Sequence, residues 1–278
     1  MDSKESKVVR GRVNERIIIN INKNSSHNRI LIGTPTRGIF RAEWAQARYG
    51  QIIPTNWTAA MTMLGYTHMM PLGYLVADAQ NIIVETAVKD NFEWVLLHED
   101  DVVLPIDAFL RINEYMKKGD IPVVSGLYFL KSAPLTEPLV YRGRGNSCYS
   151  KFNMGDLVWA DGVPTGCLLM HGSILKLMYD ESPDYQTSSG HITKKVFETP
   201  AKVWYDPEKM TQMSATGTSD LYWCDRVMKE KVLERTGWKK IAKRKFPYLV
   251  DTNIFCRHID MNTGTQYPLA LDSIGRVS

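Results

Sequence analysis

Three adjacent acidic residues, Glu99, Asp100 and Asp101, are the part of this sequence best suited to chemistry. They follow the apolar run 92–97, which predicts a buried strand. In open α/β sheets, ligands bind beyond the carboxyl ends of the strands. Carboxylates crowded there repel one another unless a cation lies among them, so removing one should relieve strain. Oxygen ligands suit Mg²⁺ or Mn²⁺, and such an ion would bring a diphosphate with it. The alternative is a solvated acidic turn that caps the helix expected after Pro105.

Asp220 is a second candidate, in the first turn of a helix predicted over 219–234. The preceding residues, 215–218, are expected to form a loop flexible enough to close on a ligand. The helix N-terminus favours the ionised carboxylate, which could then act as a general base. Ser and Asp are also common at helix starts for purely structural reasons. Helix capping therefore remains an equal alternative.

His258 is the histidine that follows a strand predicted to start at Tyr248. A lone histidine is more often structural than functional. The remaining histidines considered, His68, His171 and His191, have no partner that the sequence reveals. We expect these three to be structural or surface residues.

Alternating patterns predict the elements that position these residues. Strands are expected in the run starting at Ile30, at 92–97, 121–130, 157–160, 167–170 and from Tyr248, and helices at 39–49, 74–90, 106–118 and 219–234. A further apolar run covers 58–64. Strands that alternate with helices indicate an α/β fold, with a mostly parallel sheet covered on both faces. We expect a single Rossmann-like domain, with irregular structure from Lys131 onward.

The distribution of charge and the cysteine spacing limit which partners and which cellular compartment the sequence favours. Residues 1–29 form a polar tail with seven Lys/Arg and three Asp/Glu, which accounts for the whole net charge of +4. The tail should be dispensable for catalysis, unless its apolar segment 17–21 adds an edge strand. A body without net charge argues against a nucleic-acid partner. The four cysteines lack disulfide or zinc spacing, and neither a transmembrane run nor a secretory leader is recognisable. These features favour a cytoplasmic protein.

The segment from Trp94 to Leu110 resembles the DxD strand of family 2-like GT-A glycosyltransferases, in which the motif binds a metal and the donor's diphosphate. The motif here is either Glu99-x-Asp101 or His98-x-Asp100. The resemblance implies that Glu99 and Asp101 hold Mn²⁺ or Mg²⁺ and that Asp100 contacts the donor. Both registers depart from the strict motif.

Other segments extend the resemblance over roughly residues 30–262. Thr34-Pro35-Thr36-Arg37 resembles the loop that contacts the nucleoside, so Thr34, Pro35 and Arg37 are implied donor contacts. Gln80-Asn81 falls where the family often has Arg-Asn, and Gly166 lies in a segment similar to the acceptor-side glycine loop. The resemblance further implies that Asp220 is the general base of an inverting transfer, and that His258 completes the metal shell.

The resemblance therefore implies a GT-A fold with a nucleotide-sugar-binding half at 30–130 and an acceptor-binding half at 131–278. The implied donor is a UDP- or GDP-sugar, and the acceptor is a hydroxyl of a glycan, lipid or protein. Two alternatives remain: a nucleotidyltransferase, or a non-catalytic glycan-binding protein on a transferase scaffold. The sequence leaves the sugar, the acceptor and the oligomeric state open.

Overall fold

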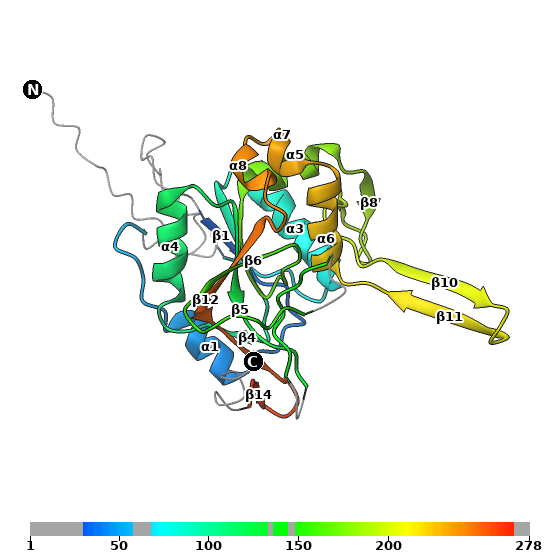
Figure 1. Ribbon diagram of the computed structural model, residues 1–278, viewed down its shortest axis with the longest axis horizontal. Coiled ribbons are helices and arrows are strands. Elements are labelled where there is room, and N and C mark those ends of the chain that lie inside the picture. Colours follow the sequence, from blue (N-terminus) through cyan, green and yellow to red (C-terminus); the bar gives the residue numbers. More distant parts are fainter. Residues whose placement is uncertain (1–29, 58–67, 133–135, 144–147, 270–278) are drawn as a thin grey trace, which may run out of the picture.

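A seven-stranded sheet in the order β2-β1-β3-β7-β5-β12-β6 forms the centre of the computed structural model, which describes residues 30–57, 68–132, 136–143 and 148–269 (Figure 1). Strands β2, β1, β3, β5 and β12 run in one direction, whereas β7 and β6 are antiparallel to their neighbours. The bounds are β1 Ile30–Gly33, β2 His68–Met69, β3 Trp94–His98, β5 Val123–Leu127, β6 Leu157–Ala160, β7 Cys167–His171 and β12 Tyr248–Phe255. The expected mostly parallel sheet is confirmed.

Helices cover both faces of this sheet because its strands are apolar on both sides. In β3, Val95 and Leu97 pack into one hydrophobic cluster with α3, α5 and α6, whereas Trp94 and Leu96 pack into the other with α4. Side chains alternate across a strand, so a continuous apolar run buries both faces. The helices are α1 Ala42–Tyr49, α3 Val76–Lys89, α4 Ala108–Lys118, α5 Gly172–Glu181, α6 Ser219–Lys229, α7 Val232–Arg235 and α8 Lys239–Ala242. The predicted α/β architecture is therefore confirmed, and both halves of the chain contribute strands to the one sheet.

Three small sheets lie beside the central one. Strand β13 (Arg257–Ile259) pairs with β14 (Gln266–Tyr267) and with β4 (Val102–Val103), so His258 is opposite Val102, next to the acidic residues. Strands β8 (Asp184–Gln186) and β9 (Ile192–Lys194) form a short hairpin. Strands β10 (Ala201–Asp206) and β11 (Thr211–Thr216) form a longer hairpin that projects away from the body (Figure 1).

The structure corrects two local predictions in the second half of the chain. The helix expected over 219–234 is broken, because α6 ends at Lys229 and Lys231 adopts a positive φ of 53° before α7 begins. The expected flexible loop at 215–218 is wrong for its first two residues, which belong to β11. The apolar run 58–64 and the tail 1–29 lie outside the described residues.

Candidate functional site

Glu99 begins the turn that follows β3, at the carboxyl end of the sheet. Its Oε1 accepts a hydrogen bond from the Thr165 hydroxyl at 2.7 Å, and its carbonyl oxygen accepts one from the Trp44 indole at 2.8 Å. Burial, together with the negative charges of Asp101 and Asp220, raises the pKa of Glu99 to about 8. Glu99 is therefore mostly protonated at neutral pH, which relieves the repulsion expected among the acidic residues.

Asp101 lies between two basic side chains. Its Oδ2 forms an ion pair with Lys131 and is 3.3 Å from Nε2 of His258. Burial alone would raise the pKa of Asp101, but His258 and Lys131 lower it to about 2. Asp101 is thus ionised, and its other oxygen, Oδ1, is buried without a hydrogen-bond partner among the described residues.

His258 is oriented by a backbone carbonyl. Its Nδ1 is 2.9 Å from the Phe129 carbonyl oxygen, which can only accept, so Nδ1 carries the proton. Its Nε2 is then directed at Asp101. Histidines that bind metals commonly donate their other N–H to a carbonyl in this way.

Asp101 and His258 supply two of the ligand atoms that a divalent cation would need. The orphaned Oδ1 of Asp101 and Nε2 of His258 are ligand atoms of the kinds that Mn²⁺ and Zn²⁺ accept. Within the described ranges, however, no group of three His, Cys, Asp or Glu side chains converges on one point. The Oε1 of Glu99 is engaged by Thr165 instead. The structure therefore brings Asp101 and His258 together, and the role of Glu99, Asp101 and His258 as metal ligands stays a prediction.

The loop at 34–37 reaches the same place. The Asp100 carboxylate accepts hydrogen bonds from the Thr36 hydroxyl and the Arg37 backbone N–H, although burial still raises its pKa overall. Thr34 and Pro35 are buried, and the Arg37 side chain is exposed. Of the predicted donor contacts in this loop, Arg37 thus reaches Asp100 through its backbone N–H.

Helix α3 brings one of its two predicted donor contacts to the site. Gln80 is fully buried and donates to the Thr165 hydroxyl at 3.0 Å, which links it through Thr165 to Glu99. Asn81 is turned elsewhere, because its side chain bonds the backbone of Val196 and Phe197. The structure gives Asn81 this internal anchoring role and does not bring it to the acidic residues.

Asp220 approaches the acidic residues from α6. Its charge contributes to the raised pKa values of Glu99 and Tyr128, which places its carboxylate on the same side of the sheet. Burial raises the pKa of Asp220 itself, although hydrogen bonds from Thr218 and Leu221 oppose this. Its Oδ1 accepts from the Leu221 backbone N–H at 2.7 Å. The side chain therefore contacts the first turn of its helix and lies near enough to Glu99 for its charge to raise the pKa of that carboxyl group.

Gly166 is required by packing within the protein. A Cβ at this position would overlap the Tyr128 hydroxyl and the Val102 side chain. Its N–H donates to the Tyr128 hydroxyl at 2.8 Å, and its carbonyl accepts from the Glu99 N–H at 3.1 Å. The close approach expected of this glycine is thus to Tyr128 and Val102, and its contact with a ligand stays a prediction.

Sequence reasoning missed Lys131, Thr165, Tyr128 and Trp44. Lys131 could have been found, because it follows the strand predicted at 121–130, whose carboxyl end lies at the same edge as that of β3. Thr165 belongs to the segment with Gly166 and was the hydroxyl donor available there. Nothing in the spacing of Trp44 relates it to Glu99.

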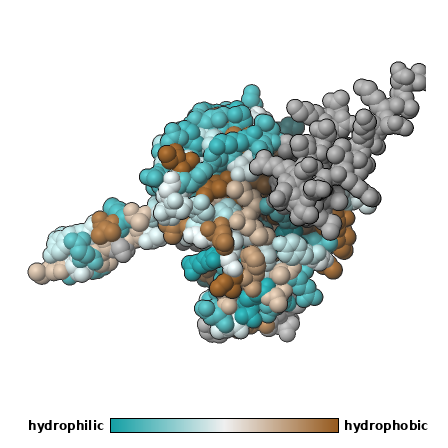
Figure 2. Space-filling model, turned by 180° about the vertical axis from the view of Figure 1, so that it is seen from behind, coloured by the Kyte–Doolittle hydropathy of each residue, from teal (hydrophilic) through white to brown (hydrophobic). Residues whose placement is uncertain are grey.

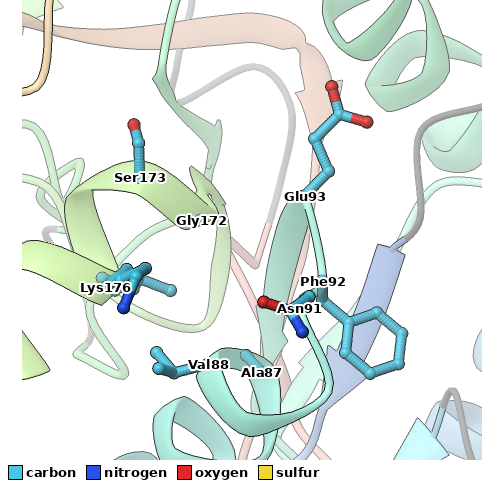
Figure 3. Close-up of a pocket in the computed structure, with 9 residues that line it drawn as sticks. Ala87, Val88, Asn91, Phe92, Glu93, Gly172, Ser173 and Lys176 are labelled. Carbon is cyan, nitrogen blue, oxygen red and sulfur yellow. The ribbon is translucent and has the colours of Figure 1, made fainter. Parts of the chain in front are cut away.

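A pocket of about 190 Å³ lies away from these residues (Figure 3). It is lined by the end of α3, the start of α5 and residues 91–93, which precede β3. It therefore lies at the amino end of the strand, opposite to the acidic cluster.

The comparisons with known proteins give only distant likenesses. No protein-family profile matches the sequence, and no curated protein matches it. Among solved structures, A197 from STIV is 13% identical, with a TM-score of 0.48 over 84% of this chain and 86% of that one. A Bacillus anthracis protein described as a glucose-1-phosphate thymidylyltransferase, in complex with a sucrose, is 10% identical, with a TM-score of 0.32 over 55% of this chain and 75% of that one. At these values neither carries an argument about function.

In the described parts of the chain, no helix combines the length and the apolar character needed to cross a bilayer.

Proposed function

We propose that this chain is a glycosyltransferase that moves a sugar from a nucleoside-diphosphate donor to a hydroxyl acceptor. The observation that carries the proposal is that four carboxyl groups and one histidine lie in the same region, beyond the carboxyl end of β3. They come from separate segments: the turn after β3, strand β13 and the first turn of α6. Carboxyl groups whose pKa values are strongly perturbed in opposite directions, here Glu99 and Asp101, are typical of functional sites.

Asp101 and His258 would hold a divalent cation, which supplies the positive charge that a leaving diphosphate needs. The loop 34–37, through its backbone at Arg37 and the buried Thr34, would enclose the nucleoside beside Asp100. Lys131 is the neighbouring ammonium group that can turn from Asp101 toward a bound phosphate. These residues form the donor side of the proposed site.

Asp220 would accept the proton of the acceptor hydroxyl. It faces the cluster from α6, so a donor held at Asp101 would present its sugar between the two elements. Burial raises the pKa of this carboxylate, which makes it a stronger base than an exposed aspartate. A base in this place suits a direct displacement with inversion at the anomeric carbon.

Calorimetry with UDP and GDP, in Mn²⁺ and in EDTA, tests the donor side. We expect binding that requires the metal and is lost in Asp101→Asn. The matched control is Asp107→Asn, which removes a carboxylate that pairs with Arg111 on the surface of α4. Equal binding in EDTA and in Mn²⁺ would contradict the metal role. Release of pyrophosphate from a nucleoside triphosphate and a sugar phosphate would establish nucleotidyl transfer instead.

A further inference from the structure

The hairpin of β10 and β11, here called the arm (residues 201–216), exposes apolar side chains far from the core. Val203 is 70% exposed, Tyr205 53% and Trp204 38%, and apolar residues are visible on the projecting arm in Figure 2. A two-stranded hairpin with both faces in water is marginally stable at best. Within the part of the chain that the structure describes, these apolar side chains of the arm therefore stay exposed to solvent.

Among the described residues, the outer edge of β10 carries backbone groups for which no hydrogen-bond partner is present. The Gly217 N–H donates to the Pro200 carbonyl at 2.8 Å, one step beyond the last pair of the arm. Hydrogen-bonded and non-hydrogen-bonded pairs alternate along an antiparallel ladder. The even-numbered residues of β10 therefore bond to β11, and the odd-numbered ones direct their N–H and C=O groups outward.

We propose that this edge pairs, antiparallel, with the same edge of a second copy of the chain, with the two-fold axis at Trp204. This register joins outward-facing Val203 to the partner's Tyr205 by backbone hydrogen bonds. It also places Lys202 opposite the partner's Asp206. Two-fold symmetry repeats each pair, so the contact closes as a dimer.

Charge selects this register over its neighbours. A shift that centres the axis on Val203 would set Lys202 opposite Trp204, and one centred on Tyr205 would set Asp206 opposite Trp204. Only the axis at Trp204 pairs the two opposite charges of β10. Asp206 keeps Oδ1 for the backbone of the turn, and its Oδ2 is 3.8 Å from exposed Lys209, a contact that a closer partner can replace.

Pairing would also cover apolar surface. Met213 lies directly across from Trp204 in the arm, so both side chains are on one face. The dimer would gather these two residues from both copies at the centre of a four-stranded sheet, which is the size range in which sheets become stable. The tip of each arm would then lie beside the root of the partner's arm, where Gly217 leads into α6 and Asp220.

Sedimentation of the full chain at micromolar concentration is the first test. We expect about 63 kDa, twice the chain mass of 31.7 kDa. The matched variant replaces residues 201–216 by Gly-Gly, which can join Pro200 to Gly217 because these two are already hydrogen-bonded. It should be folded and monomeric. A monomeric full chain, or an armless chain that still dimerises, would overturn the proposal.

Single cysteines test the register. A cysteine at a two-fold axis faces its own copy, and a non-hydrogen-bonded pair has a Cα separation of about 4.5 Å, within the range for disulfides. In a Cys148→Ser background, Trp204→Cys should therefore form a covalent dimer on mild oxidation. Val203→Cys faces the partner's Tyr205 and should cross-link far less. Equal cross-linking at both positions, or preference for Val203→Cys, would rule out this register.

Charge reversal tests the pairing without replacing any apolar residue. Lys202→Glu sets like charges opposite each other twice, and should raise the dimer Kd about tenfold. Lys176→Glu, the same change on the exposed face of α5, is the control and should leave the Kd unchanged. If both variants shift the Kd equally, net charge rather than this pairing governs association.

Discussion

The carboxylates beyond β3 are in different states although they are neighbours in the chain. Glu99 is buried against other carboxylates and holds its proton to about pH 8, whereas Asp101 is paired with Lys131 and His258 and is ionised down to about pH 2. Environments that push two carboxyl pKa values apart are typical of sites where each group has its own task. At neutral pH, Asp101 is therefore ionised, whereas Glu99 is mostly protonated.

Asp220→Asn is expected to lower turnover by about 10²–10⁴-fold, because the amide cannot accept the acceptor's proton. Nucleotide affinity and melting temperature should change little, since Asn can still accept the hydrogen bond from the Leu221 N–H. Steady-state kinetics and calorimetry of the same preparation measure both. Proton NMR of the first-formed product should show inversion. Near-normal turnover, or retention of configuration, would show that Asp220 stabilises the first turn of α6 and is not the general base.

Asp101→Ala is expected to destabilise the metal-free protein. Repulsion among three carboxylates would predict a gain in stability, but Asp101 already forms an ion pair with Lys131 and lies 3.3 Å from Nε2 of His258. Its removal leaves two partly buried basic groups without their acceptor, at a cost of about 1–2 kcal/mol. Urea unfolding of wild type and variant in EDTA measures the difference, and a more stable variant would show that repulsion dominates.

At the scale of elements, the start of α5 depends on a neutral histidine. His171 is the N-cap residue, and its Nδ1 accepts the Ser173 N–H at 3.1 Å, which an imidazolium could not do. Burial lowers the pKa of His171 below its usual 6.5. The unfolded chain then binds a proton more readily than the folded one, so stability is full above about pH 6.5 and falls as the pH decreases below it.

His171→Asn should flatten this pH dependence, because Asn caps helices well and does not titrate. The measurement is the free energy of unfolding at several pH values between 5 and 7.5, compared as a slope. The slope isolates the proton effect from the packing that His171 makes with Trp94 and Trp238. Parallel slopes in wild type and variant would mean that another group governs this range.

At the scale of the whole molecule, β3 lies between two hydrophobic clusters and carries the site at its end. Leu96 and Leu97 are each fully buried, in opposite clusters. Truncating either to alanine should cost about 2–5 kcal/mol. Leu157→Ala on β6 is the control, since that side chain is 54% exposed and should cost well under the core values. Denaturant unfolding measures the free energy of unfolding of all three variants. A loss at Leu96 or Leu97 as small as that at Leu157 would mean that one of the two layers packs loosely.

The sequence by itself determined the layered fold and the place of the acidic residues. Apolar runs of strand length cannot stay in water, so β3, β6 and β7 were predictable to within a residue or two. Helix α4 was predictable in the same way. It ends at Gly119, a glycine with a left-handed φ of 58°, which is a common way for a helix to end. These features depend on local pattern and on burial, which one segment of chain reveals.

Tertiary structure alone decided which side chains meet. The pairing of β4 with β13 sets His258 beside Asp101, and the order of the sheet brings Lys131 to the same edge. The sequence predicted the same role for Gln80 and Asn81. In the structure, Gln80 bonds Thr165, whereas Asn81 bonds the backbone of residues 196–197. The arm was equally invisible, because its strands bury no face against the body and so leave no pattern of burial in the sequence. Contacts between distant segments depend on the whole packing, which no local pattern encodes.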